Sequence, residues 1–245
     1  MEVHHHPQLQ HKPKPWKEYL LEGLMIFLAV LMGFIAENIR ESISEHKRAA
    51  EFARSYYESI KKDTSQLHGL IKFSKHKIRA CDSTIAAFHL PDNPERDTIE
   101  YREGQVTSNV FPFHPSSGSY DQIKSSGSLR FFKQKMVNLM NEYDLQAKQA
   151  VERDGIDMKF IVDQYIPFVM RLLNLEVGYD FRFGPKSTHE FYFADRSLAT
   201  KRIFINYESV AKLMRLRSMQ EYVKLLEVAD RVLSELKSEY SLDDE

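Results

Sequence analysis

The residues best suited to chemistry in this chain of 245 residues are the histidines near its start. His4, His5 and His6 are consecutive, and His11 follows them closely. Neutral imidazoles bind transition metals, and clustered histidines can do so without a folded scaffold. Nothing in the surrounding tail fixes a coordination geometry or supplies outer hydrogen-bond partners. The cluster is therefore a weak candidate metal site, and the alternative interpretation is a solvated tail.

The other chemistry-bearing residues are scattered along the sequence. The remaining histidines show neither an H-E-x-x-H sequence nor a paired Glu-x-x-His spacing, and the nucleophile-elbow, P-loop and dinucleotide-binding motifs are missing. Cys81 is the single cysteine, so an intrachain disulfide is excluded, and its place among apolar residues predicts a small core residue. These patterns select no enzyme class, and we predict no catalytic residue and no cofactor.

Composition narrows the class of protein without selecting a reaction. Hydrophobic residues make up 42% of the chain and charged residues 28%, as in chains that bury a core. Nine glycines and nine prolines are few for this length, which favours long helices. The formal net charge of −1 removes the global electrostatic argument for nucleic acid, so we predict no nucleic-acid partner.

A more specific pattern, S-Y-D-Q-I-K-S-S-G-S-L, occupies residues 119–129. Ser119 is a candidate helix N-cap, with Gln122 as its capping-box partner, and Gly127 interrupts the pattern. One interpretation is a structural break between helices. The other is a binding loop that presents hydroxyl and backbone N–H groups at the start of a helix.

Aromatic side chains gather in two connections that we expect to be non-helical. Rings in loops must be buried or must meet a partner, because their apolar area is large. One interpretation packs the two loops on each other over one end of a helical bundle, and the other leaves a subset exposed as an interaction surface. The residues concerned are Phe111, Phe113, Tyr179, Phe181, Phe183, Phe191, Tyr192 and Phe193.

The elements that position these groups begin with an apolar stretch at residues 19–39. As a helix it is about 31 Å long, which matches a hydrocarbon core of about 30 Å. Its Leu, Ile, Phe and Val residues contribute roughly −3 to −7 kcal/mol to insertion, which outweighs the terminal Glu22 and Glu37. We predict an uncleaved signal anchor; the alternatives are a buried core helix and a cleaved signal peptide. The predicted membrane helix includes Leu20, Leu24, Phe27, Leu31, Gly33, Ile35 and Ile39.

Charges beside this stretch are nearly balanced, so they fix its orientation poorly. We expect a single-pass protein of the inner (cytoplasmic) membrane with its soluble domain in the periplasm. Ala29 and Gly33 form a small-x-x-x-small pair on the helix face that carries Glu22. The hypothesis is that this face pairs two copies of the chain or docks on another membrane protein. The expected partners are therefore the lipid bilayer and either a second copy of the chain or another membrane protein.

Beyond the membrane segment the pattern is mainly helical. Apolar residues recur at steps of three and four from Ile39 to Phe88, and Pro91 ends this element. The connection at residues 91–118 is expected to contain a short extended piece at 110–113.

A helical pattern resumes at Ser128 and continues to Leu175, with Gly155 and Pro167 as expected weak points. Residues 177–206 alternate as in an irregular hairpin, and a last helix is expected at 207–240.

Two stretches carry a resemblance to known proteins. The opening MEVHHHP, followed by KEYLLEGLMIFLAVLMGFIAENIRE, resembles an uncharacterised family of single-pass membrane proteins from Bacteroidota. Residues 119–133 are similar to a Tyr-Asp-x-x-x-x-Ser-Gly-x-Leu pattern in related membrane-anchored proteins. The resemblance is close at the N-terminus and loose elsewhere. It implies an N-terminal membrane helix and a mostly helical soluble part, and it implies no activity.

We therefore predict an all-α protein in which a transmembrane helix precedes an antiparallel helical bundle with a small aromatic hairpin region. The expected segments are a polar His-rich tail (1–18), the membrane helix (19–39), the bundle (40–240) and an acidic tail (241–245). The expected function is that of a non-enzymatic interaction or scaffold protein of the bacterial envelope. The alternatives are a membrane-tethered ligand-binding or sensor module and an unrecognised enzyme. A deep pocket of polar groups with shifted pKa values would favour an alternative, and a flat apolar patch would favour the first reading.

Overall fold

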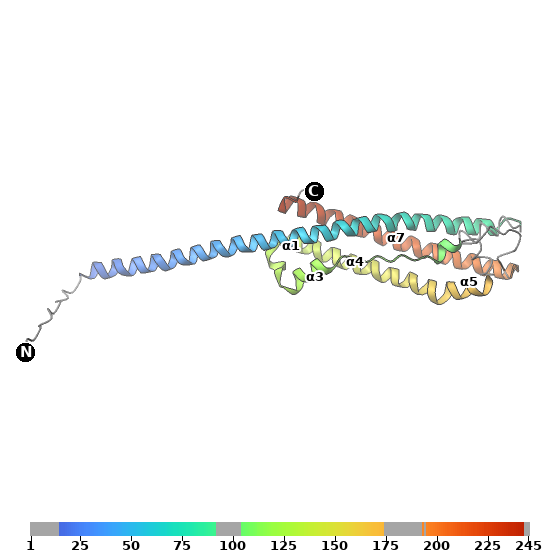
Figure 1. Ribbon diagram of the computed structural model, residues 1–245, viewed down its shortest axis with the longest axis horizontal. Helices are drawn as coiled ribbons and strands as arrows, with labels where there is room; N and C mark the ends of the chain where they lie inside the picture. Colours follow the sequence, from blue (N-terminus) through green and yellow to red (C-terminus); the bar gives the residue numbers. More distant parts are fainter. Residues whose placement is uncertain (1–14, 92–103, 174–192, 194, 243–245) are drawn as a thin grey trace, which may run out of the picture. The chain divides into compact units, whose positions relative to one another are not determined.

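The computed structural model describes residues 15–91, 104–173, 193 and 195–242 (Figure 1). This part of the chain is 88% helical and contains no strand, so the predicted all-α class is confirmed. The chain divides into two compact units, Met1–Ala49 and Ala50–Glu245. The hairpin predicted within residues 177–206 lies largely outside the described ranges. Among the described residues, Leu173 and Phe193 form an isolated antiparallel bridge.

The first helix, α1, spans Trp16–Phe88. It begins directly after Pro15, which cannot lie in a helix interior, and it carries Glu18 in its first turn, where an acid favours the helix dipole. The sequence contains no proline between Pro15 and Pro91, so nothing breaks the helix before the turn at His89–Leu90. The predicted end of this element near Pro91 is confirmed.

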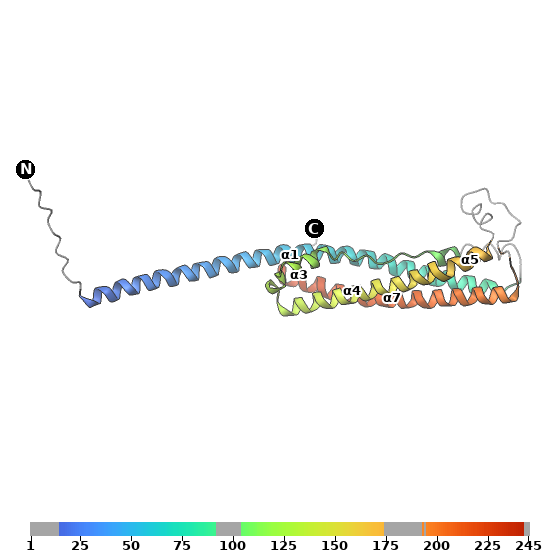
Figure 2. The same cartoon turned by 90° about the horizontal axis from the view of Figure 1, so that it is seen from below.

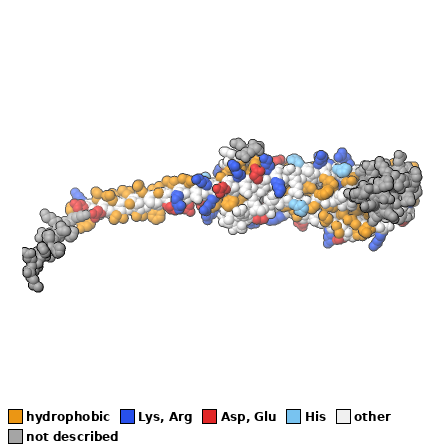
Figure 3. Space-filling model, viewed as in Figure 1, with side chains coloured by type: hydrophobic (Ala, Val, Ile, Leu, Met, Phe, Trp, Pro, Cys, Tyr) orange, Lys and Arg blue, Asp and Glu red, His pale blue; other side chains and the backbone are white. Residues whose placement is uncertain are grey.

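In the first unit, the apolar side chains of α1 are exposed around the helix (Figure 3). The exposed fraction is 62% for Leu20, 61% for Phe27 and 51% for Ile35, and Leu24, Leu31 and Ile39 are also exposed. A Cβ atom at Gly33 would contact nothing within 4 Å. Within the described residues, α1 is the helix long and apolar enough to cross a membrane. This exposure contradicts the alternative of a buried core helix.

The second unit is a bundle whose consecutive long elements alternate in direction (Figures 1 and 2). The second half of α1 runs one way. Residues 104–117, which we call the strap, return alongside it as a short helical turn followed by an irregular stretch. The helix α4 (Gln134–Phe160) then runs parallel to α1, and α7 (Leu198–Tyr240) runs back against it. A non-helical segment therefore takes the place that a fourth long helix would fill.

The buried residues of the three long helices, α1, α4 and α7, recur at alternating steps of three and four. This repeat is typical of helices whose side chains interlock along a shared seam. On α4 the buried positions start at Met136 and Met140 and continue through Tyr143 to Ala150. The same steps place several polar and charged residues inward. These buried polar residues are Asp63, Ser74, Lys77, Thr84, Asp154, Asp157, Glu208, Arg215 and Ser218.

Between α4 and the strap, the chain makes a short helix α3 (Gly118–Ser125) and a 3₁₀ turn η1 (Ser128–Phe131). Gly127 joins them with φ 69°, a left-handed conformation that glycine adopts at no steric cost. The predicted interruption at Gly127 is confirmed. The predicted N-cap was wrong, because Ser117 holds that position and the Ser119 hydroxyl donates instead to Ser59 Oγ at 2.9 Å.

The break after α4 is a π-helical turn, η2 (Ile161–Tyr165), which leads into α5 (Ile166–Leu172). Pro167 has no N–H, and its ring crowds the preceding turn, so the wider π turn relieves the conflict. The expected weak point at Pro167 is confirmed, whereas Gly155 lies inside an uninterrupted α4. The predicted single helix from Ser128 was wrong, since α4 begins six residues later.

The last helix, α7, begins nine residues earlier than predicted. Ser197 is its N-cap, and the side-chain oxygen accepts a hydrogen bond from the Thr200 N–H at 3.2 Å. At the other end, Ser241 takes a left-handed conformation and Leu242 packs into the main hydrophobic cluster. Leu242 is thus buried, although the segment 241–245 was expected to be a solvated tail.

Candidate functional site

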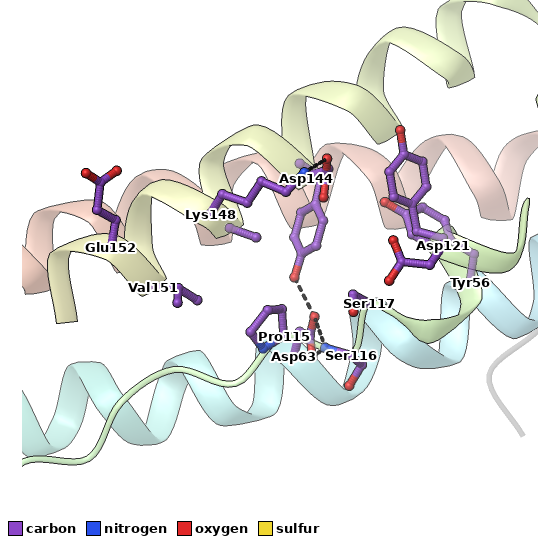
Figure 4. A pocket seen from close by; sticks show the side chains of 13 residues that line it. Tyr56, Asp63, Pro115, Ser116, Ser117, Asp121, Asp144, Lys148, Val151 and Glu152 are labelled. Atoms are coloured by element: carbon purple, nitrogen blue, oxygen red, sulfur yellow. Dashed lines mark hydrogen bonds and ion pairs between the residues drawn. The ribbon is translucent and has the colours of Figure 1, made fainter. Parts of the chain in front are cut away.

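A cavity of about 410 Å³ opens beside α1, the strap and α4 in the second unit (Figure 4). Tyr56 and Asp63 contribute from α1, residues 115–117 from the strap, Tyr120 from α3, and residues 143–152 from α4. Most of its accessible wall is carbon. The volume falls within the range of pockets that bind small molecules, which is about 300–1,000 Å³.

Asp63 lies on the wall of this cavity and is 1% exposed. The backbone N–H of Ser116 donates to both carboxylate oxygens at 2.9 and 3.1 Å, and the Tyr143 hydroxyl donates to Oδ2 at 2.8 Å. Because a backbone N–H can only donate, the carboxylate acts as the acceptor here. No lysine or arginine of the described part forms an ion pair with Asp63. Asp63 is thus a buried acid without a paired cation.

Three tyrosines surround the cavity, and each is buried. The rings of Tyr56 and Tyr120 lie 5.9 Å apart with a 40° angle between their planes. The hydroxyl of Tyr120 donates to Asn141 Oδ1 at 2.6 Å, whereas the buried hydroxyl of Tyr56 has no hydrogen-bond partner within the described residues. A buried polar group without a partner is rare in folded proteins, so it calls for an explanation.

The tyrosines are held in their neutral forms. Burial raises the pKa of Tyr56 well above its ordinary value, and the nearby Tyr120, Asp144 and Asp63 raise it further. Burial and the carboxylate of Asp63 likewise raise the pKa of Tyr143. Tyr56 and the groups that act on it, Tyr120, Asp144 and Asp63, all line the cavity.

The rim of the cavity is acidic. Asp121, Asp144 and Glu152 line it together with one lysine, Lys148. Lys148 Nζ forms an ion pair with Asp144 Oδ2 at 2.7 Å, and Figure 4 shows this pair across the cavity from Asp63 and Ser116. With Asp63 included, the wall carries four carboxylates and one ammonium group, so its local charge is negative.

The strap is held in place by buried side chains at successive levels of the bundle. Lys77 Nζ donates to the carbonyl oxygen of Asn109 at 3.0 Å, and the Phe113 N–H donates to Asp154 Oδ2 at 2.8 Å. Asp63 holds Ser116 in the same way, one level further along. Since an irregular segment has no internal ladder for its backbone groups, these side chains satisfy them instead.

A second buried carboxylate, Glu208 on α7, lies at the other end of the strap. Tyr165 donates to its Oε1 at 2.6 Å, and the Thr107 hydroxyl donates to its Oε2 at 2.8 Å. Cys81 Sγ lies 3.5 Å from Thr107 Oγ1. Because Thr107 gives its own hydrogen to Glu208, the thiol is the donor of this last contact.

The Glu208 cluster is closed. Beside Tyr165 there is a cavity of only about 20 Å³, enough for roughly one water molecule. Burial raises the pKa of Glu208, and burial together with Glu208 raises the pKa of the Cys81 thiol to about 12. The prediction that Cys81 is a core residue is confirmed, since it is fully buried. Its protonated thiol is a poor nucleophile.

Between the two carboxylates lies an ion-paired layer. Arg215, which is fully buried, forms an ion pair with Asp157 at 3.0 Å, and Arg153 approaches the same carboxylate at 2.9 Å. Tyr222 donates to Asp154 in the same layer. Here each charge lies near an opposite one, in contrast to Asp63.

The aromatic residues predicted as an interaction surface are separated by the fold. Phe113 is 1% exposed and belongs to the main core, whereas Phe193 packs on Phe88 and Phe204 in another cluster. Phe111 is 54% exposed and touches the ring of Phe73. The described rings therefore do not pack on each other, and the exposed-surface hypothesis survives for Phe111 alone among them. The other predicted residues lie outside the described ranges: Tyr179, Phe181, Phe183, Phe191 and Tyr192.

The candidate metal ligands His4, His5 and His6 also lie outside the described ranges. Within those ranges, no group of three or more His, Cys, Asp and Glu residues could hold a metal ion. The residues 119–129 form a helix break, and of this segment Tyr120 and Asp121 line the cavity.

Sequence reasoning missed Asp63, Tyr56 and Tyr143 as site residues. The available signal was the spacing: Ile60, Asp63 and Leu67 follow steps of three and four, which places the aspartate on the buried face. Comparison with known proteins adds no assignment, since no family model, no curated protein and no solved structure matches the chain.

Proposed function

We propose that the chain is a membrane-anchored, non-enzymatic binding module: residues 19–39 hold it in a bilayer, and the bundle receives a small ligand in the Asp63 cavity. The observation that carries the proposal is this cavity, where a buried carboxylate without a paired cation and three neutral tyrosines converge. Convergent polar groups with shifted pKa values in an apolar pocket are the usual mark of a binding site.

The anchor part of the proposal depends on the exposed side chains of α1. In water, Leu20, Phe27 and Phe34 would leave more than half of their area unprotected, whereas a bilayer would cover it. The resemblance to single-pass Bacteroidota proteins supports the same assignment. We further propose the inner membrane as the location and the periplasm as the side of the bundle.

Membrane attachment is tested by alkaline carbonate extraction. The full-length protein is expected in the membrane pellet, and a chain that begins near Glu45 is expected to be soluble and still helical by circular dichroism. Recovery of the full-length protein in the supernatant would contradict the anchor. Alkaline phosphatase fused after Glu245 is expected to be active, because that enzyme requires the periplasm; inactivity would reverse the proposed orientation.

Ligand binding is tested on the full-length protein in a neutral detergent by ligand-observed NMR, using small aromatic fragments of positive, zero and negative charge. Val151 lines the cavity and is 41% exposed, so Val151→Trp fills the entrance from the surface. Leu145, on the same helix and 59% exposed, does not line the cavity, and Leu145→Trp is the matched control. Fragment signals that survive Val151→Trp, or the lack of any signal, would contradict the proposal.

A second candidate function, an interaction or scaffold protein of the envelope, is favoured by the outer surface of α4. Leu145 and Ile156 are 59% and 47% exposed there, and their spacing of three helical turns places them on one face. Crosslinking in native membranes tests it. A crosslinked product that disappears with Leu145→Lys and Ile156→Lys would favour the scaffold, and one that is unchanged would remove its support.

A further inference from the structure

The charge of the Asp63 cavity indicates which ligands it can accept. An ionised carboxylate removed from water is normally offset by a paired cation, because desolvation alone is costly. Asp157 has two arginines for this purpose, at 2.9 and 3.0 Å. Asp63 has only neutral donors, the Ser116 N–H and the Tyr143 hydroxyl, so an opposite charge is the component that its surroundings lack.

The rest of the wall reinforces the negative sign. Asp121 and Glu152 add their charges, and the single ammonium group, Lys148, is already engaged by Asp144 at 2.7 Å. A cavity lined by one sign of charge within low-dielectric walls concentrates ions of the other sign. An anionic ligand would find no unengaged cation on this wall, whereas a cation would find Asp63.

The tyrosines fit the same class of ligand. The faces of aromatic rings attract ammonium groups, most strongly where water is excluded. The Tyr56 hydroxyl is buried and has no hydrogen-bond partner within the described residues, so the wall of the cavity includes a residue whose polar group is unsatisfied. Val151, Pro115 and Ala147 supply apolar surface, and the volume of about 410 Å³ is larger than a bare metal ion requires.

We propose that the cavity binds an organic monocation, with its ammonium group beside Asp63 and an apolar or aromatic body between the tyrosines and Val151. This inference rests on the proposed function, because it names the class of ligand for the same site.

The test uses the full-length protein in a neutral detergent and three probes with nearly the same body. These are 2-phenylethylammonium, 2-phenylethanol and 3-phenylpropanoate, whose charges are positive, zero and negative. The dissociation constants are measured by NMR titration. We expect the cation to bind at least about tenfold more tightly than the alcohol, the effect of one charge-assisted contact. The carboxylate is expected to bind more weakly than either.

Variants then locate the charge that discriminates. Asp63→Asn is expected to weaken binding of the cation about tenfold and to leave the alcohol almost unchanged. Glu152→Gln, which removes an exposed charge from the rim, is the matched control and is expected to change affinity by about threefold or less. Near-ultraviolet circular dichroism confirms that each variant is folded. If Asp63→Asn does not fold, Val151→Trp replaces it as the test of the site. We then expect Val151→Trp to abolish binding of the cation, and binding that persists would contradict the inference.

The outcomes separate this inference from the proposed function. Equal binding of all three probes, lost with Val151→Trp, would retain the binding module and overturn the cationic class. Binding of the cation that persists with both Asp63→Asn and Val151→Trp would overturn the site. Binding of none of the probes would contradict both the inference and the proposed function.

Discussion

Two buried carboxylates in this bundle accept hydrogen bonds from similar neutral donors, but the space beside them differs. Asp63 and Glu208 each accept a hydrogen bond from a tyrosine of the α4–η2 region, Tyr143 or Tyr165, and each holds one end of the strap. A cavity of about 410 Å³ adjoins Asp63, whereas only about 20 Å³ lies beside Tyr165 in the Glu208 cluster. The difference teaches that a buried acid alone does not mark a site; accessible space beside it does.

The largest expected effect is on stability, when each carboxylate is removed. Glu208→Ala leaves the hydroxyls of Tyr165 and Thr107 unsatisfied in a closed core, so it should lower the free energy of unfolding by about 3–5 kcal/mol. Asp63→Ala should cost only about 1–2 kcal/mol, because water in the cavity can replace the lost acceptor. Denaturant unfolding of the two variants in one detergent measures both values. Equal losses would remove the distinction between the clusters.

A smaller effect is expected when a single hydroxyl is removed from each cluster. Tyr165→Phe leaves one oxygen of the buried Glu208 without its donor and should cost about 1–3 kcal/mol. Tyr56→Phe removes a hydroxyl without a hydrogen-bond partner in the described part, and stability should change by less than about 0.5 kcal/mol. Thermal unfolding followed by circular dichroism compares the pair. A marked loss with Tyr56→Phe would show that its hydroxyl has a structural partner.

The smallest effect concerns pH. Burial raises the pKa of Glu208, so the folded protein binds this proton more tightly than the unfolded chain does. The stability that the proton contributes is present below the ordinary glutamate pKa and is lost as the pH rises through the raised value. Glu208→Gln removes this loss. The unfolding midpoint of the wild type should therefore fall, relative to that of the variant, between acidic and neutral pH.

Asp154 also has a pKa raised by burial, but it is present in both proteins, so its contribution cancels in the difference. Unfolding midpoints that stay parallel across this range would mean that Glu208 does not exchange its proton there.

The sequence was sufficient to predict the long helices and part of their buried faces, since the predicted seam includes Ile60, Leu67 and Cys81, which are buried. Steps of three and four starting from Ile71, Ile78 and Ile85 predict an apolar seam, yet these residues are only half-buried. Buried positions near them include Lys77 and Thr84, together with Ser74, which the steps of three and four do place on the seam. Apolar counting misses Lys77 because it treats polar residues as solvent-facing, whereas Lys77 donates to the carbonyl oxygen of Asn109 in the strap.

The same cause explains what was missed on α7 and at the candidate site. The apolar pattern of residues 207–240 predicts Val210, Leu213, Leu225, Ala229 and Leu236 inside. The last three are buried, whereas Val210 and Leu213 are exposed, and Glu208, Ala211 and Arg215 take inner positions. That Asp63 adjoins a cavity depends on Ser116 and Tyr143, which are distant in sequence. Spacing along one helix can place Asp63 on the inner face, but it carries no information on the space that the other elements leave beside it.

The most direct measurement of the central claim, that the Asp63 cavity is open and acidic while the Glu208 cluster is closed, is thiol labelling of one protein at both places. Ala147 lines the cavity, and Ala147→Cys introduces a thiol there, while the native Cys81 reports on the closed cluster. The folded full-length variant is treated with a cationic reagent, 2-(trimethylammonio)ethyl methanethiosulfonate, or an anionic one, 2-sulfonatoethyl methanethiosulfonate, and peptide mass spectrometry locates the label. We expect labelling at position 147, faster with the cationic reagent, while Cys81 stays unmodified until the protein unfolds. A thiol at position 147 that is as inert as Cys81 toward both reagents would contradict the account.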